Sequence, residues 1–265
     1  MLTETGAFRL SRHLTRLVAV FVLAYVPAAM AQGAWTVEVH TGTSWKPPTT
    51  LRIEQAGHED VTIRGVRYET RPWSSFQSLA LLTMNYYRVR VGYAWPVQPV
   101  DLGVLGVRDV AWGAEVELLH DKAYYLSGDD QGGIVQHFEL SDGINYLLGN
   151  ATATWSTPLT GDDGEAVGTA ELTARAGVGP VITKPAATIR GLEYGADLQG
   201  TLNGYELAGM GAAMGVGARW FVTPHVFLAL ESTASYATTR QSIANGTAST
   251  NLPTLHVTFG VGMRP

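Results

Sequence analysis

The sequence predicts an all-β protein in which about eight antiparallel strands close into an up-and-down transmembrane β-barrel. Apolar residues recur with a period of two, which places successive side chains on opposite faces of a strand. The other face combines glycine with charged residues, as suits the interior of a small barrel. Beyond residue 31 no apolar run is long enough for a spanning helix, and a closed barrel is the other fold that satisfies every backbone hydrogen bond in lipid.

The first 31 residues are expected to be a secretory signal, which leaves 32–265 as the outer-membrane barrel domain. Arginines precede an apolar core at Leu17–Val26, and Ala29–Ala31 supplies the small residues of a cleavage site. The alternative is a retained anchor helix, for which this apolar core is short. The formal net charge of −5 leaves no basic patch large enough for a nucleic acid. There is no cysteine, so disulfides give no clue to the compartment.

Eight segments show the alternation, and each is near the ~10 residues that a tilted membrane strand needs. In chain order, the expected strands are Trp35–His40, Tyr86–Tyr93, Ala111–Tyr125, Val135–Ala153, Val167–Ile182, the two halves of the hairpin Gly209–Tyr236, and Leu255–Met263. The hairpin carries the clearest signal, because Met210, Val216 and Trp220 alternate with small residues before a turn at Pro224. The apolar side of each strand is expected to face lipid, including Phe138 and Tyr146 on the fourth strand.

The connections are expected to alternate between the two ends of the barrel. The long outer loops are Thr43–Asn85, Thr183–Asn203 and Arg240–Pro253, and the first contains a short polar hairpin from Leu51–Gln55 and Val61–Tyr68. Ser127–Gly133 and Ser156–Glu165 are short turns, whereas Trp95–Val110 is longer than a usual periplasmic connection. With the N-terminus in the periplasm, five tryptophans fall at periplasmic ends, as an aromatic girdle requires: Trp35, Trp95, Trp112, Trp155 and Trp220.

Charged and polar residues of both signs are expected to fill the lumen. They are Glu38, His40, Arg88, Arg90, Glu115, Glu117, His137, Glu139, Arg175, Arg219, Glu231 and His256. Opposite charges in a confined space need one another, and eight strands leave room for side chains only. We therefore expect a salt-bridged plug rather than an open ion channel, with His40 and His256 hydrogen-bonded inside it.

A second polar cluster is expected at the outer end of the third and fourth strands. His120, Asp121, His137 and Glu139 are acid–base or metal-competent residues at one height, and they are the candidate catalytic residues. Strict alternation puts His120 on the lipid side and His137 inside, so a bulge is needed to unite them. The alternatives are that His120 and Lys122 bind headgroup phosphates, and that His137 and Glu139 pair with Arg175.

The same stretch resembles a family of small proteobacterial outer-membrane barrels described as similar to lipid A oxidase. The resemblance lies in Trp112–Lys122, in Val135–Asn145, in Gly177–Gly179 followed by Thr188–Gly191, and around Ala218–Phe221. It implies oxidation of the proximal glucosamine of lipid A by dioxygen, with a divalent metal as the possible cofactor. The ending Met263-Arg264-Pro265 departs from the terminal aromatic residue that is usual in outer-membrane assembly signals.

Two functions therefore compete. The first is a non-enzymatic barrel of the outer membrane with long extracellular loops and a structural or binding role. The second is the lipid A-modifying enzyme. The expected partners in both are outer-membrane lipids, lipopolysaccharide and the outer-membrane assembly machinery. A soluble lipocalin-like barrel is the third possibility, and it requires the apolar face to point inward.

Overall fold

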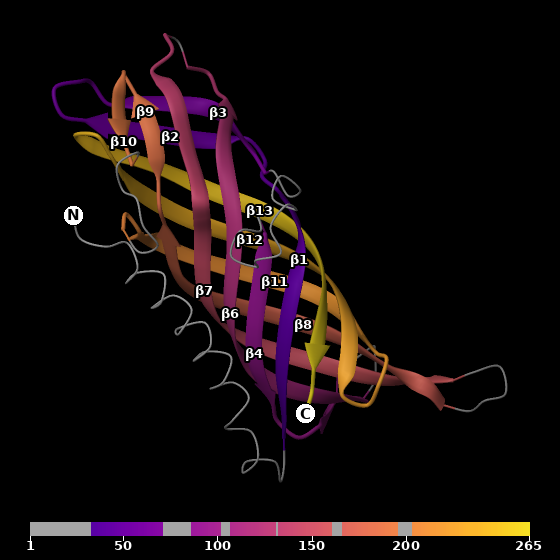
Figure 1. Ribbon diagram of the computed structural model, residues 1–265. Helices are drawn as coiled ribbons and strands as arrows, with labels where there is room; N and C mark the ends of the chain where they lie inside the picture. The colour runs from indigo at the N-terminus through magenta and orange to yellow at the C-terminus, as the bar shows by residue number, and fades with distance from the viewer. Residues whose placement is uncertain (1–32, 71–85, 102–106, 131, 161–165, 196–202) are drawn as a thin grey trace, which may run out of the picture.

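The computed structural model is a closed antiparallel barrel of steeply tilted strands (Figure 1). It describes residues 33–70, 86–101, 107–130, 132–160, 166–195 and 203–265. The expected signal Met1–Ala31 lies outside these residues. Within them, no helix is both long and apolar enough to cross a membrane.

Eight strands form the wall of the barrel. They are β1 (Ala34–Trp45), β4 (Tyr87–Ala94), β6 (Val107–Ser127), β7 (Val135–Thr160), β8 (Ala166–Thr183), β11 (Glu206–Phe221), β12 (Val226–Ile243) and β13 (Gly246–Met263). Each pairs antiparallel with the next in this order, and β13 pairs back onto β1 from Val37↔Met263 to Trp45↔Leu255. The predicted fold class and all eight expected strands are confirmed.

Four further strands lengthen the barrel at one end, which we call the extended end. The hairpin of β2 (Thr49–Gln55) and β3 (Val61–Glu69) bridges β13 to β6, while β9 (Ala186–Ile189) pairs with β7 and with β10 (Leu192–Tyr194). Figure 1 shows them gathered at the end of the molecule away from the C-terminus. At the opposite end, β5 (Gln98–Asp101) pairs with the start of β6. This short hairpin accounts for the length of the Trp95–Val110 connection.

The apolar exterior is confirmed on seven of the eight strands, with Leu172, Met214, Leu230 and Phe259 all more than half exposed. The inward face of β11 is built of small residues, because large side chains from other strands need its space. A Cβ at Gly211 would lie 2.7 Å from Cδ1 of Tyr146. Four tryptophans, Trp35, Trp95, Trp112 and Trp220, are exposed near the end opposite the extended end, which we call the tryptophan end.

The expected facing of β7 is wrong. Phe138, Leu140 and Tyr146 are 0–1% exposed and belong to one apolar core, whereas His137 and Glu139 point outward. The core occupies the extended end of the barrel, where Leu51 and Ile53 of β2 and Ile63 of β3 join it. The β2–β3 hairpin is therefore half apolar, because one of its faces packs into the barrel. The lumen there is a hydrophobic core, so the apolar face of β7 turns inward.

Two expected loops also differ. Arg240–Pro253 is not a loop, because β12 and β13 run on as paired strands to Ile243↔Gly246 and turn over two residues, Ala244 and Asn245. Asn245 has φ 56°, the left-handed conformation that tight hairpin turns require and asparagine tolerates. Thr183–Asn203 contains β9 and β10 in its described part.

Candidate functional site

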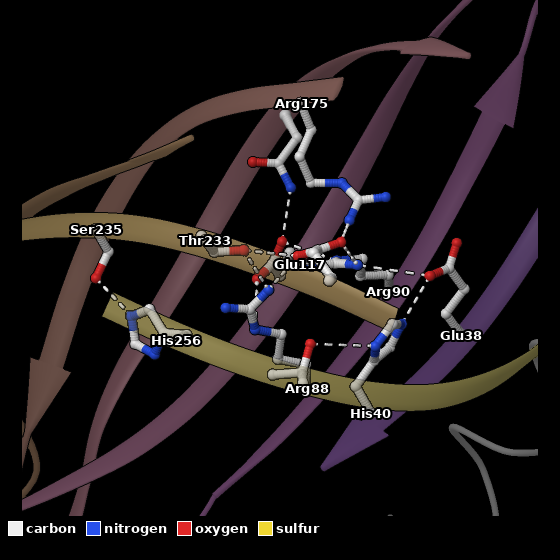
Figure 2. Close-up of polar contacts among 12 residues, drawn as sticks. Glu38, His40, Arg88, Arg90, Glu117, Arg175, Thr233, Ser235 and His256 are labelled. Carbon is white, nitrogen blue, oxygen red and sulfur yellow. Dashed lines mark hydrogen bonds and ion pairs between the residues drawn. The ribbon is translucent and has the colours of Figure 1, made fainter. Parts of the chain in front are cut away.

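Between the apolar core and the tryptophan end, the lumen holds a network of paired charges, which we call the lumen network; Figure 2 shows part of it. Its members are Glu38, Arg88, Arg90, Glu115, Glu117, Arg175, Arg219 and Glu231, each at most 7% exposed. Arg90 donates from Nε to Glu117 at 2.9 Å and from Nη1 to Glu231 at 2.9 Å. Arg175 also pairs with Glu115, at 3.2 Å, and with Glu231.

The charges of this network cancel, since four arginines face four glutamates. Buried charge is costly unless it is paired and hydrogen-bonded, and side chains from several strands complete the pairing. Arg88 donates to Thr233 at 2.9 Å, and Asn150 donates to Glu117 at 2.9 Å. The expected pairing of His137 and Glu139 with Arg175 is wrong, because Arg175 is occupied in the lumen.

Two histidines border the lumen network and are hydrogen-bonded as expected. His40 contacts Glu38 at 2.7 Å, and His256 lies 2.7 Å from the hydroxyl of Ser235 (Figure 2). His256 also lies 3.1 Å from the hydroxyl of Tyr86. Both are at most 2% exposed.

Asp121 belongs to the interior, at the boundary between the lumen network and the apolar core. It accepts a hydrogen bond from Lys46 Nζ at 2.6 Å and from the hydroxyl of Ser44 at 2.9 Å. Lys46 also donates to Thr70 at 3.0 Å and to the carbonyl of Lys122 at 3.0 Å. Asp121 thus fixes the end of β1 to β6 and does not share a face with His120.

His120 lies on the outer face of β6, yet it is only 5% exposed. The ring of Tyr87 on β4 stacks on its imidazole, with centroids 4.6 Å apart and planes at 9°. On β7, Gly143 leaves room for the ring, because a Cβ there would lie 2.3 Å from Cε1 of His120. Gly143 has φ 114°, and it sits in an irregular stretch of β7 where the register with β6 shifts beyond Asp121.

Asn145 sets the tautomer of this imidazole. Its Nδ2 donates to the carbonyl of Ile182 at 3.3 Å, which leaves Oδ1 to accept from Nδ1–H of His120 at 2.8 Å. The neutral ring then carries its lone pair on Nε2. That nitrogen is buried and has no hydrogen-bond partner in the structure. An imidazole fixed through Nδ1 with a free Nε2 can accept a proton or a hydrogen bond.

More polar residues surround His120 at the same height, on the outer faces of neighbouring strands. Asp142 pairs with Lys184 at 2.8 Å, and Tyr205 donates its hydroxyl to the Asp142 carbonyl at 2.9 Å. Lys184 lies 5.8 Å from the centre of the Tyr205 ring. Burial raises the pKa of the Tyr205 hydroxyl, and so do the nearby Asp142 and Tyr87. We call this surface the rim patch, formed by Tyr87, His120, Lys122, Asp142, Lys184 and Tyr205.

The other two predicted site residues lie farther along β7 on the outer face. The side chain of His137 is 50% exposed and lies 3.5 Å from Glu139, which accepts from the hydroxyl of Ser141 at 2.6 Å. The structure thus leaves His120, His137 and Glu139 on the outer face and Asp121 inside. In the described part of the chain, no group of three or more such side chains is placed to hold a metal ion.

Sequence reasoning missed the residues that hold His120 in place. Gly143, Asn145 and Tyr205 were expected as ordinary strand or loop residues. An Asp142-Gly143 pair inside a strand is a sign of irregular pairing, and it is the one signal in the sequence that indicates this site.

An outer belt of apolar side chains around an interior of paired charges defines a class, the membrane-spanning β-barrels. The protein is an integral barrel of the bacterial outer membrane.

No family model and no curated protein matches the sequence. Similar solved structures include the outer membrane protein AlkL in lipid bilayers, with 12% identity, a TM-score of 0.38, and coverage of 90% of this chain and 94% of that one. Neisserial surface protein A has 9% identity, a TM-score of 0.34, and coverage of 86% and 96%. OprG from Pseudomonas aeruginosa has 9% identity, a TM-score of 0.34, and coverage of 89% and 96%. The class of this protein follows from its own apolar belt and charge-paired interior.

Proposed function

We propose that the protein is a closed envelope barrel that acts through its extended end, in a structural or binding role. The observation that carries the proposal is the filled lumen. The lumen network fills the part of the lumen toward the tryptophan end, and the core around Tyr146 and Phe138 fills the part toward the extended end. A barrel of eight strands has an interior just wide enough for side chains, so this filling leaves no path for solutes.

The tryptophan girdle and the elaborated strands β2, β3, β9 and β10 favour an orientation with the extended end outside the cell. In that orientation the rim patch contacts the outer leaflet, and lipopolysaccharide is the proposed lipid partner. The outer-membrane assembly machinery is the proposed partner during insertion, with Phe259 as the substitute for a terminal aromatic residue.

Conductance in planar bilayers tests the closed barrel. We expect the folded protein to insert without stepwise conductance, because the charges of the lumen network are buried and paired. A large porin inserted in the same way is the control. Steady, voltage-independent channels from folded protein would contradict the proposal.

The second candidate is the lipid A-modifying oxidoreductase that the resemblance implies, and the placement of His120 favours it. The imidazole of His120, held through Nδ1 and without a partner on Nε2, lies at the edge of the apolar belt toward the extended end. The sugars of an outer-leaflet lipid would lie at this height. His137 and Glu139 share that outer face. The four predicted residues do not fit a metal, because Asp121 is bound to Lys46 in the interior.

Lipid A mass spectra from a host that lacks the activity decide between the two candidates. A gain of one oxygen on the sugar that His120→Gln abolishes, with the barrel still folded, supports the enzyme. Unchanged lipid A from folded wild-type protein, in the presence of dioxygen and divalent metals, contradicts it.

A further inference from the structure

A buried polar side chain without partners lies in the apolar core of the extended end. Gln241 is 0% exposed on the inner face of β12, between Ala237 and Ile243, which both belong to that core. Among the described residues, neither the oxygen nor the nitrogen of its side-chain amide has a hydrogen-bond partner. A buried amide of this kind costs free energy, so it points to a bound molecule that completes its hydrogen bonds.

Thr183 of β8 is a second such residue at the same level of the barrel. It is 0% exposed, and its hydroxyl also lacks a partner in the described part of the chain. Gly209 of β11 pairs with Val181 of β8 on one side and with Thr239 of β12 on the other. Thr183 and Gln241 each lie two residues closer to the extended end than these partners. The two polar groups therefore flank β11 from either side.

The surroundings of the two groups are apolar. Ala208 is the small buried residue of β11 between them, and β9 lies against β12 and brings Ala187 and Ile189 into the same core. An alcohol or an amide suits the two polar groups, because it both donates and accepts a hydrogen bond. The remainder of such a molecule has to be apolar, since alkyl side chains surround it.

The β9–β10 hairpin borders this corner of the core and has few strand contacts. β9 pairs with β7 on one side, whereas β10 pairs with β9 alone in the described part of the sheet. The two-residue turn of the hairpin is Arg190-Gly191, with φ values of 53° and 75°. Glycine takes this left-handed conformation freely, but arginine is strained in it. A strained residue at such a position indicates that its side chain has a role.

The side chain of Arg190 ties the hairpin to two others. It donates from Nη1 to Oε1 of Gln55 at 3.1 Å and from Nη2 to the carbonyl of Glu59 at 2.9 Å, both next to the β2–β3 turn. Gln55 in turn donates from Nε2 to the carbonyl of Ala244 in the β12–β13 turn, at 2.9 Å. Two side chains thus join the tips of three hairpins at the extended end.

From this geometry we propose that the corner around Gln241 and Thr183 binds a small, mainly apolar molecule with an alcohol or amide group, and that the β9–β10 hairpin is its lid. Because side chains fill the core, entry requires the hairpin to move, and the contacts of Arg190 hold it shut. The proposal rests on the binding role of the extended end proposed above and names a ligand class for it.

Hexanol and hexane test the polar group of the bound molecule. The full barrel, folded in dodecylphosphocholine micelles and labelled with ¹⁵N-glutamine, is titrated with hexanol, and hexane at the same ratio to detergent is the parallel titration. We expect a saturable shift of the Gln241 side-chain amide resonance with hexanol alone. The amide of the exposed Gln98, at the tryptophan end, should stay in place.

Gln241→Leu assigns the binding to the amide. The leucine fills a similar volume without polar atoms, so the urea midpoint of the variant should equal or exceed that of the wild type. Hexanol should raise the urea midpoint of the wild type and leave that of Gln241→Leu unchanged. Gel mobility without heating confirms that both are folded.

Arg190→Asn tests the lid. Asparagine tolerates the left-handed turn and removes the guanidinium group, so amide hydrogen exchange in residues 186–194 should accelerate at least about tenfold. Arg240→Asn, which replaces an exposed arginine that does not contact the hairpin, is the matched control and should exchange as the wild type does.

Three results in folded protein overturn the binding site: no saturable shift with hexanol, an equal shift with hexane, or equal stabilisation of Gln241→Leu and the wild type by hexanol. A water molecule on Gln241 gives the first result, together with an amide-to-water Overhauser effect. Unchanged hydrogen exchange in Arg190→Asn overturns the lid. Failure of the closed barrel is detected separately, because channel conductance does not depend on Gln241.

Discussion

An arginine at Leu230 should destabilise the barrel, because this side chain points into lipid near the middle of the membrane. Leu230 is 61% exposed on the outer face of β12, six residues before the interfacial Tyr236. Six residues at ~3.3 Å, along a strand tilted by ~40°, place it about 15 Å below the level of Tyr236. The apolar band of such a barrel is ~25 Å tall, so Leu230 lies near its centre, where an arginine costs ~2–4 kcal/mol.

Thr238→Arg is the matched control. Thr238 is on the same strand and face, two residues beyond Tyr236 and two before the native Arg240. At that height the cost falls to ~0–1 kcal/mol. The difference between the variants, about 2–3 kcal/mol, corresponds to a roughly 30- to 150-fold change in the unfolding equilibrium constant.

Urea unfolding in phospholipid vesicles, followed by tryptophan fluorescence, measures the free energy of unfolding of each variant. Gel mobility without heating reports the folded fraction. Equal unfolding midpoints for Leu230→Arg and Thr238→Arg would refute the assignment of lipid-facing side chains.

Three further predictions concern the interior and the orientation. Lys46→Met should destabilise the barrel by about 3–5 kcal/mol, measured by the same urea titration, because Asp121 loses the ammonium group 2.6 Å from it. Gly211→Ala should cost about 1–3 kcal/mol in thermal or urea unfolding, because the added methyl meets the ring of Tyr146. Glu59→Cys, in a chain without native cysteine, should react with an impermeant maleimide on intact cells.

Each of these three predictions has a control variant in the same protein. The double variant Lys46→Met/Asp121→Leu should recover most of the loss, and no recovery would mean that the pair itself is not the cause. Gly149→Ala should be close to neutral, since a Cβ there meets no atom within 4 Å. Thr223→Cys, at the tryptophan end, should react only after lysis, and the reverse pattern would invert the orientation.

The period of two predicted most of the barrel because it reports a physical constraint on every strand. Glu38, Arg88, Glu115 and Arg219 alternate with residues that contact lipid, and all four are buried in the structure. On these strands only one face is polar, so the sequence determines which side points inward. β7 runs past both the lumen network and the apolar core. Phe138 points into the apolar core, and the sequence pattern does not distinguish an apolar interior from lipid.

The extended end was harder to predict because its strands are rich in threonine and serine. Arg240–Pro253 has the composition of a loop, and Pro253 lies between the last residue of β13 that pairs with β2 and the first that pairs with β1. A proline is tolerated in that gap in the ladder. The Asn245-Gly246 pair was the available signal for a tight hairpin turn.

The candidate site depended on details that no strand pattern contains. His120 was placed correctly on the lipid side, but its burial results from Tyr87 on another strand and from the local backbone at Gly143. His137 and Asp121 were expected to approach His120. They do not, because β7 faces the other way and Lys46 holds Asp121 inside.

The lumen network draws its charges from β1, β4, β6, β8, β11 and β12, so that a partly formed sheet leaves some of them unmatched. Glu38 on β1 meets Arg219 on β11 only after the first and last strands have joined. Before closure its partners are limited to His40 on the same strand and Arg90 on the neighbouring β4. Closing the seam between β1 and β13 therefore also completes the charge pairing, so the charges that fill the lumen favour the closed barrel over an open sheet.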